Sequence, residues 1–320
     1  MSKLKIWLIT AASLMILGLL IFAITMSSIG WNFKRLSTVE YQTTTHTINE
    51  EFSNISIDID TADITFAKSD DESCKVISYE EKNCPHSVFV ENGTLKIEFT
   101  DSKKFFDFFG INFDSANLTV YLPEKEYAAL SIKSSTGNIE IPNSCSFKSA
   151  DISASTSDVK VSAFIKNDLK ITVSTGDIYV ENTGIGGSLN LISSTGDKTI
   201  SNVSVNEDVF SQSSTGDMTF HNVTCKNLKL SGSTSDIFLN NTVASEKLDI
   251  RVNTGNISLD GADGSEIYIK ASTGDITGTL LSEKVFFANS DTGDVDVPRS
   301  TTGGICEITT RTGDIKVSIK

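Results

Sequence analysis

The sequence is poor in proline and in positive charge. Four prolines and 21 glycines in 320 residues exclude a collagen-like or proline-rich chain. The 27 basic residues are outnumbered by 41 acidic ones, which gives a net charge of −14. Because nucleic-acid affinity depends on clustered Lys and Arg, this balance argues against a nucleic-acid partner. An acidic excess is typical of a surface that charge keeps soluble.

Paired cysteines of the metal-binding kind are absent as well. The five cysteines include no CxxC pair, so the sequence predicts neither a zinc site nor thioredoxin-like chemistry. Cys74 and Cys84 lie close together in a polar stretch and are candidates for a disulfide in an exported domain. Cys145, Cys225 and Cys306 stand among apolar neighbours, where a free thiol behaves as a small hydrophobic side chain.

Catalytic motifs are missing too. The sequence has no nucleophile elbow, P-loop, HExxH or dinucleotide-binding pattern. Its three histidines, His46, His86 and His221, are scattered, as solvated or structural histidines usually are. We therefore expect no catalytic residue, no cofactor and no metal site. A polysaccharide lyase or hydrolase is the enzymatic alternative, because such enzymes cluster carboxylates or basic residues on one face of a β-helix.

One long apolar run stands near the start of the chain. Residues 6–24 are almost entirely apolar, and no charge occurs between Lys5 and Lys34. In a helix this run spans about 28 Å, close to the thickness of the hydrocarbon core. Trp7 and Trp31 flank it, as interfacial anchors often do.

These features predict a single-pass membrane anchor over residues 6–26, preceded by a cytoplasmic tip of residues 1–5. The long acidic remainder favours an orientation in which the bulk of the chain lies outside the cytoplasm at the cell membrane. A cleaved signal peptide is the alternative, but its apolar region is usually shorter and ends in a small-x-small site. Residues 27–45 are interpreted as a linker.

A turn motif centred on threonine recurs ten times at intervals of 19 or 20 residues, most often as Ser-Thr-Gly-Asp. On both sides of each turn apolar and polar residues alternate, a period of two that predicts β-strands. Three residues after the threonine the row is apolar except at Lys198, which we interpret as a local register slip. The ten threonines are Thr136, Thr156, Thr175, Thr195, Thr215, Thr234, Thr254, Thr273, Thr292 and Thr312.

We predict an all-β fold for residues 130–320: a single-stranded parallel β-helix, or solenoid, of about ten coils of 19–20 residues. One coil cannot bury its own apolar face, whereas stacked coils bury all of them together. At about 4.8 Å per coil the rod is about 45–50 Å long. We expect it to be right-handed, since parallel β connections prefer that hand.

Residues 46–129 are predicted to form a β-rich cap on the N-terminal end of the core. They contain a degenerate copy of the motif at 61–64 and a hairpin signal, Asn92-Gly93. An aromatic segment interrupts them, and we interpret its rings as sealing the core end. Contact with a membrane surface or a partner is the alternative. These rings are Phe105, Phe106, Phe108 and Phe109.

The aspartates of the turns are predicted to form one column. Asp is a good turn residue because its side chain can bond its own backbone, so we favour a structural role. Binding of Ca²⁺ or of a cationic surface is the alternative, with Asp177, Asp197 and Asp217 as weak candidates. The Gly-rich nonapeptide of known calcium-binding solenoids is absent.

The order of these parts resembles a known bacterial family, the "putative adhesin" proteins of unknown biochemical function that are similar to LiaG and YvlB. The resemblance covers about residues 48–320 and implies a β-helical protein of the cell envelope without assigned catalytic residues. It is carried by the repeated Ser-Thr-Gly-Asp-Ile turns and by the segments 61–64, 92–95 and 120–123.

Together the sequence features predict a non-enzymatic, membrane-anchored envelope protein. We expect an adhesin or interaction scaffold that binds an unknown protein or glycan. An envelope-stress sensor or regulator is the alternative hypothesis, and a carbohydrate-active enzyme is a less favoured one.

Overall fold

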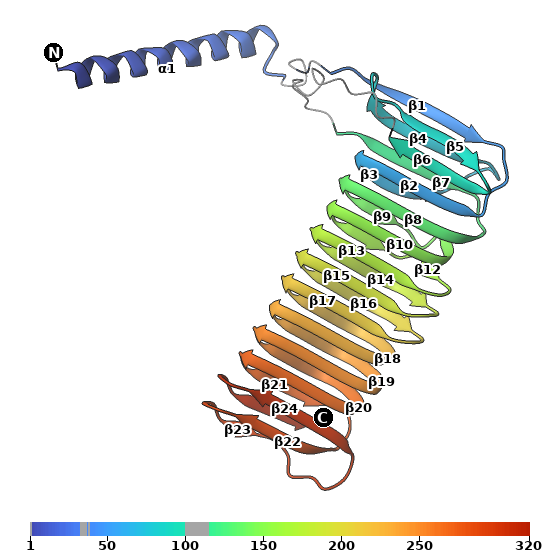
Figure 1. Ribbon diagram of the computed structural model, residues 1–320, viewed down its shortest axis with the longest axis vertical. Coiled ribbons are helices and arrows are strands. Elements are labelled where there is room, and N and C mark those ends of the chain that lie inside the picture. Colours follow the sequence, from blue (N-terminus) through green and yellow to red (C-terminus); the bar gives the residue numbers. More distant parts are fainter. Residues whose placement is uncertain (1, 33–36, 38, 100–114) are drawn as a thin grey trace.

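The computed structural model describes residues 2–32, 37, 39–99 and 115–320. One helix, α1 (Lys3–Ser28), comes first, and the strands that follow belong to one continuous hydrogen-bonded sheet (Figure 1). The helix is long and apolar enough to cross a membrane, although a signal sequence has the same character. Of its side chains only Met26 is buried.

The strands of the N-terminal part are β1 (Tyr41–Ile48), β2 (Asn54–Thr61), β3 (Asp63–Lys68), β4 (Cys74–Glu81), β5 (His86–Glu91), β6 (Thr94–Phe99) and β7 (Asn117–Leu122). The first regular coils contain β8 (Glu126–Thr136), β9 (Ile139–Ile141), β10 (Ser146–Thr156), β11 (Val159–Val161), β12 (Phe164–Ile165), β13 (Leu169–Thr175), β14 (Ile178–Ile185), β15 (Leu189–Thr195), β16 (Lys198–Val205) and β17 (Val209–Thr215). The remaining strands are β18 (Met218–Thr234), β19 (Ile237–Thr254), β20 (Ile257–Thr273), β21 (Ile276–Leu280), β22 (Lys284–Ser290), β23 (Val295–Asp296), β24 (Gly304–Thr310) and β25 (Ile315–Ile319).

The predicted solenoid is confirmed. Each coil has one strand before the threonine turn and one after it, and equivalent strands of successive coils pair in parallel. The pairing is residue for residue, so that Thr175 lies beside Thr195 and Thr195 beside Thr215. The inward rows therefore become continuous columns that are apolar at most positions, and residues such as Ile178 and Leu189 are fully buried. Stacking removes the apolar face of every coil from water at once.

The turn glycines are required by geometry. Gly176 has a φ of +129°, which side chains rarely adopt, and a Cβ there would lie 2.0 Å from the carbonyl oxygen of Ser157 in the coil above. Ser157 and Ser235, which replace glycine in two turns, have buried hydroxyls without a hydrogen-bond partner. Gly232 makes room for Ser235, because a Cβ at Gly232 would lie 2.8 Å from the Cβ of that serine.

The N-terminal part is partly solenoid and partly cap. The degenerate motif at 61–64 is a true coil, because Thr61 pairs with Thr136 although 75 residues separate them. Strands β6 and β7 add a further level on β2 and β3 by parallel pairing. Strands β1, β4 and β5 run antiparallel to their neighbours and cover this end. The aromatic segment with Phe105, Phe106, Phe108 and Phe109 lies outside the described residues.

At the other end the last two coils are stacked in reverse order. Strand β24 lies between β20 and β22, and β25 lies between β21 and β23 (Figure 1). The outermost coil is therefore 284–296, and the coil that comes last in the sequence is the penultimate one in space. A buried ion pair spans this arrangement, because Lys284 Nζ lies 2.7 Å from Asp263 Oδ1 of β20. The sequence repeat alone does not reveal this exchange, because both coils carry the same pattern.

Candidate functional site

The turn aspartates form a ladder between coils. In each coil the backbone N–H of the Asp or Asn donates to the side-chain Oδ1 of its equivalent in the adjacent coil, at 2.6–3.1 Å. The side-chain oxygen thus accepts from the backbone of the adjacent coil and not from its own turn. The expectation that each Asp bonds its own backbone is corrected in this respect. Along the rod the order is Asp63, Asn138, Asp158, Asp177, Asp197, Asp217, Asp236, Asn256, Asp275, Asp314 and Asp294.

This ladder explains the column without a ligand. Asp177, Asp197 and Asp217 lie in consecutive coils, and each uses one carboxylate oxygen to satisfy a backbone donor. The second oxygen of Asp177 accepts a hydrogen bond of 3.1 Å from Tyr179, and burial together with the carboxylates of Asp177, Asp158 and Asp197 raises the pKa of that phenol. Within the described residues no three His, Cys, Asp or Glu side chains are arranged to hold a metal ion.

A second ladder, of asparagines, was missed by the sequence analysis. Asn182, Asn202, Asn222 and Asn241 stand seven residues after their turn threonines, and all four have φ near +50°. The side-chain amide of each donates to the amide oxygen of the one before, at 2.8–2.9 Å. Asn tolerates the left-handed conformation better than most residues. The recurrence of Asn at the same position of four successive repeats was therefore the sequence signal that could have revealed this ladder.

Lys198 is a buried lysine and not a register slip. It pairs in register with Ile178 and Met218 on the two adjacent coils, and its side chain is fully buried. Its ammonium donates to the Ser193 hydroxyl at 2.6 Å, and Ser193 lies 3.3 Å from the Ser213 hydroxyl. Burial lowers the pKa of Lys198 to about 8, against a smaller opposing effect of Asp197. Lys198, Ser193 and Ser213 are each at most 4% exposed, so a substrate has little access to the cluster.

The cap contains a buried carboxylate–imidazole pair. The Glu80 Oε2 accepts from the backbone N–H of His86 and lies 2.7 Å from its Nδ1, and both side chains are nearly inaccessible. Burial alone would raise the pKa of Glu80, but hydrogen bonds from His86 and Thr44 hold it below its usual value. The pair borders a cavity of about 300 Å³ that Asp60 and Asp63 also line. His86 is thus buried and hydrogen-bonded to Glu80, and its structural role stays a prediction.

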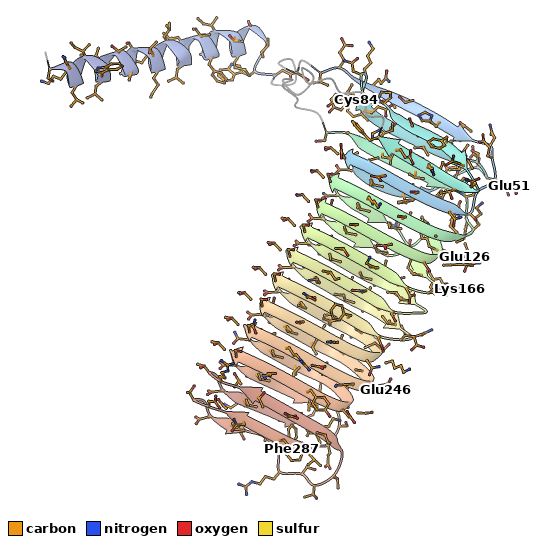
Figure 2. The ribbon with its side chains drawn as sticks, in the orientation of Figure 1. Glu51, Cys84, Glu126, Lys166, Glu246 and Phe287 are labelled. Atoms are coloured by element: carbon orange, nitrogen blue, oxygen red, sulfur yellow. The ribbon has the colours of Figure 1, made fainter. Side chains whose placement is uncertain are left out.

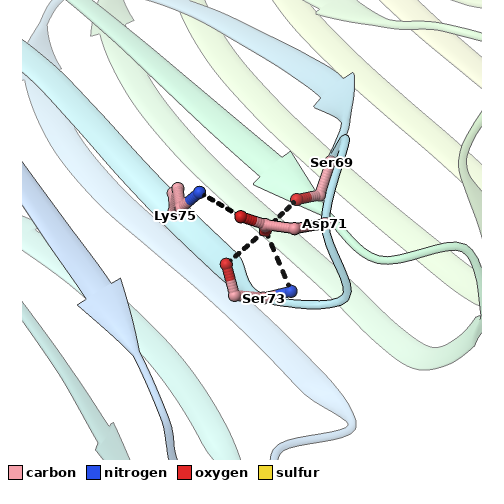
Figure 3. Close-up of polar contacts among 4 residues, drawn as sticks. All are labelled: Ser69, Asp71, Ser73 and Lys75. Carbon is pink, nitrogen blue, oxygen red and sulfur yellow. Dashed lines mark hydrogen bonds and ion pairs between the residues drawn. The ribbon is translucent and has the colours of Figure 1, made fainter.

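A polar cluster at the turn between β3 and β4 is also structural. Figure 3 shows Ser69, Ser73 and Lys75 converging on the carboxylate of Asp71. Hydrogen bonds from Lys75, Ser73 and Ser69 hold the pKa of Asp71 far below its usual value. These hydrogen bonds all form within seven residues of the chain. The cluster therefore fixes a turn, and the Asp71 carboxylate is already engaged.

The disulfide suggested between Cys74 and Cys84 is not formed, and both thiols are free and buried. Cys74 begins strand β4, whereas Cys84 lies beyond the other end of that strand. Figure 2 labels Cys84 at the edge of the cap. An eight-residue strand is about 25 Å long, far more than a disulfide can bridge. Burial raises the pKa of Cys74 to about 12, so this thiol is unreactive.

The outward side of the coils near β22 has a hollow that an aromatic ring and charged side chains border. A shallow hollow of about 300 Å³ crosses β19, β20 and β24. Asp249 lies at its base, only 7% exposed, with both carboxylate oxygens held by the Arg251 guanidinium at 3.0 and 3.2 Å. The Tyr268 ring forms one wall, and Lys247 Nζ lies 4.4 Å from its centroid. This arrangement combines an aromatic wall with fixed hydrogen-bonding groups.

Several solved structures have some likeness to this chain. A "putative adhesin" from Bacteroides fragilis is 18% identical, with 86% of this chain and 97% of that chain covered and a TM-score of 0.37. A "putative adhesin" from Parabacteroides distasonis is 14% identical, with 88% and 98% covered and a TM-score of 0.43. A "putative lipid binding protein" from Parabacteroides distasonis is 14% identical, with 87% and 97% covered and a TM-score of 0.34. Likenesses this weak carry no argument about function.

The search of curated proteins found no match. The model of the Toastrack DUF4097 family matches residues 52–209 and again residues 204–320. The two matches run from the first coil, which contains β2, to the last strand, so they span the whole solenoid. The expected resemblance to a family of unknown biochemical function is confirmed at this level, and the closer likeness to LiaG and YvlB stays a prediction. The chain belongs to the Toastrack DUF4097 family.

Proposed function

We propose that the chain is a non-enzymatic, membrane-anchored protein of the cell envelope whose solenoid binds a partner outside the cytoplasm. In this role it acts as an adhesin or an interaction scaffold. The observation that carries the proposal is the combination of one exposed apolar helix, α1, with a long rod of stacked coils. A helix of 26 residues spans a bilayer with some tilt, and it has no binding partner in the described fold.

The polar groups of the rod support a binding role better than catalysis. The turn carboxylates are engaged in the backbone ladder, Lys198 is fully buried, and the Glu80 carboxylate is held by His86. Stacked coils instead present flat faces on which side chains repeat at about 4.8 Å, a geometry suited to extended partners.

A fractionation experiment tests the anchor and its orientation. The full chain with a C-terminal tag should stay in the membrane after high-salt and alkaline washes, and it should leave only with detergent. In intact spheroplasts added protease should remove the tag. A matched variant, Leu14→Arg, places a charge at the centre of α1 and should reduce membrane retention, because a central Arg costs about 2.5–3.5 kcal/mol on insertion scales. A mature protein whose N-terminus begins after α1 would refute the anchor.

A binding experiment tests the partner role. Detergent-solubilised full chain should co-sediment with washed envelope fractions and should release no soluble sugar from them. Release of sugar that depends on the intact fold would instead support the enzymatic alternative. Altered stress-gene expression in a deletion strain, with no loss of envelope binding by the purified chain, would favour a sensor or regulator.

A further inference from the structure

Four adjacent strands near the end of the rod carry a row of alternating carboxylates and rings on their outward side. The strand register places Asp249 beside Tyr268, Tyr268 beside Glu307, and Glu307 beside Phe287. The two rings are two strands apart, which corresponds to about 9–10 Å along the rod axis. Figure 2 labels Phe287 at this end of the molecule.

Polar groups line the next row of the same face. The register places Arg251, Lys270 and Thr309 side by side, and together with Tyr268 they border the hollow of about 300 Å³. Because the Arg251 guanidinium donates hydrogen bonds to both oxygens of Asp249, these two side chains are fixed before a ligand binds. Fixed donors and acceptors reduce the entropy that a ligand loses on binding.

Exposed apolar side chains gather at the same end. Beyond Trp31, seven large apolar side chains of the described residues are prominently exposed, and four of them lie between residues 281 and 305. On the outward face itself Phe287 is 58% exposed and Ile305 is 44% exposed. The four side chains share one end of the rod, and two of them lie on the outward face, as is typical of an interaction site.

We propose that the outward face of β19, β20, β24 and β22 binds an extended β-linked polysaccharide that runs along the rod axis. This proposal rests on the proposed function and names the class of partner. Sugar rings stack their apolar CH faces on aromatic rings, and their hydroxyls bond carboxylates and guanidinium groups. One disaccharide unit of an extended β-linked chain has about the length that separates Tyr268 from Phe287.

The charge pattern of the row favours a sugar over a polyanion. Asp249 and Glu307 flank Tyr268 on both sides, so a phosphate backbone would meet two carboxylates. Sugar hydroxyls both donate and accept hydrogen bonds, and they can therefore use these carboxylates together with Arg251 and Lys270.

The same column contains a third ring further along the rod. Phe210 lies three strands before Tyr268, which corresponds to about 14 Å, and Lys229 Nζ lies 5.8 Å from its centroid. A disaccharide or trisaccharide is too short to reach from Phe287 to Phe210, whereas a hexasaccharide is long enough. Only long oligosaccharides should therefore respond to a change at Phe210.

Calorimetric titration of the full chain in detergent with cello- and chito-oligosaccharides of two to six sugars tests the proposal. Affinity should rise with length, and Tyr268→Ala or Phe287→Ala should each weaken hexasaccharide binding about three- to tenfold, the usual value of one ring contact. Tyr268→Phe should retain binding. Phe210→Ala should weaken the hexasaccharide and leave the disaccharide unchanged, because a disaccharide is too short to join Phe210 to Tyr268.

Matched controls are Phe164→Ala and Phe238→Ala, whose rings are 49% and 40% exposed on other sides of the coils. They should bind like the unaltered chain, and circular dichroism should show that all variants keep the solenoid. Co-sedimentation with cellulose, chitin and peptidoglycan sacculi separates the sources of a β-linked chain.

Two results would overturn the polysaccharide site. One is the absence of binding to every oligosaccharide at millimolar concentration and to every insoluble polymer. The other is an equal loss of affinity in the control variants. If the chain still co-sediments with protein-containing envelope fractions through contacts that Tyr268→Ala leaves intact, the site is refuted and the proposed function stands. If the chain binds neither polysaccharide nor envelope, both proposals fail.

Discussion

Lys198→Met should make the solenoid more stable at neutral pH. Lys198 is fully buried between Ile178 and Met218 in a column that is otherwise apolar. Methionine has nearly the same length and already occupies the next position of this column. The change therefore removes a buried charge without leaving a large cavity.

The magnitude follows from the pKa. Burial lowers the pKa of Lys198 from 10.5 to about 8. At about 1.4 kcal/mol per unit of pKa, the buried ammonium costs about 3 kcal/mol of folding free energy below pH 8. The variant loses one hydrogen bond to Ser193, which is worth about 1 kcal/mol. The expected net gain at pH 7 is thus about 2 kcal/mol.

The sign of the pH dependence follows from the same values. Between pH 8 and 10.5 the folded chain has released the Lys198 proton while the unfolded chain still binds it. The stability of the unaltered chain therefore rises with pH in this window, and the advantage of Lys198→Met disappears. Other titrating groups are common to both proteins and cancel in the difference.

Urea unfolding of both full chains, followed by circular dichroism at pH 7 and pH 10, measures this effect. Lys160→Met is the matched control, because Lys160 lies on the outward side of β11, two strands from β16 in the same stack, and its Nζ lies 3.2 Å from Glu181 Oε2. It should shift stability by less than about 0.5 kcal/mol. A Lys198→Met chain that is less stable at pH 7, or a difference that does not change with pH, would refute the account of a charged buried lysine.

Three further perturbations probe the ladder, the turn and the reversed coils. Asp197→Asn should be nearly neutral, since Asn keeps the Oδ1 acceptor, whereas Asp197→Ala should cost about 1 kcal/mol in urea unfolding because the N–H of Asp217 loses its partner; equal effects of Asn and Ala would contradict the ladder. Gly176→Ala should destabilise by at least 2–3 kcal/mol, because its Cβ would overlap a backbone carbonyl at 2.0 Å, and a thermal melt as high as that of the unaltered chain would disprove this steric argument. Lys284→Ala removes the cation beside Asp263, whose Oδ1 keeps the hydrogen bond from the Gly264 N–H, and should cost about 1–3 kcal/mol, seen as faster hydrogen exchange confined to β22–β25; unchanged protection there would show that the ion pair does not hold the outer coil.

Much of the fold could be predicted because stacked coils repeat their chemistry. A period of 19 or 20 residues, apolar alternation and a turn glycine at constant phase determine which residues face inward and which share a column. The structure places Ile178, Leu189 and Leu228 in the core as that pattern predicts. The proposed binding surface was not predicted, because Tyr268 and Phe287 are two coils apart in space only after the last coils change order.

The sequence by itself thus determined the kind of fold, the inward rows and the turn column, since each depends on local alternation and backbone conformation. Only the tertiary structure decided which coil lies next to which. The connections at 281–283 and 297–303 allow the chain to skip one level and return to it. A chain that stacked these coils in sequence order would show the same periodic pattern. The partners of the turn carboxylates and the burial of Lys198 were decided at the same level. They depend on contacts between coils that lie about 20 residues apart in sequence and about 4.8 Å apart in space.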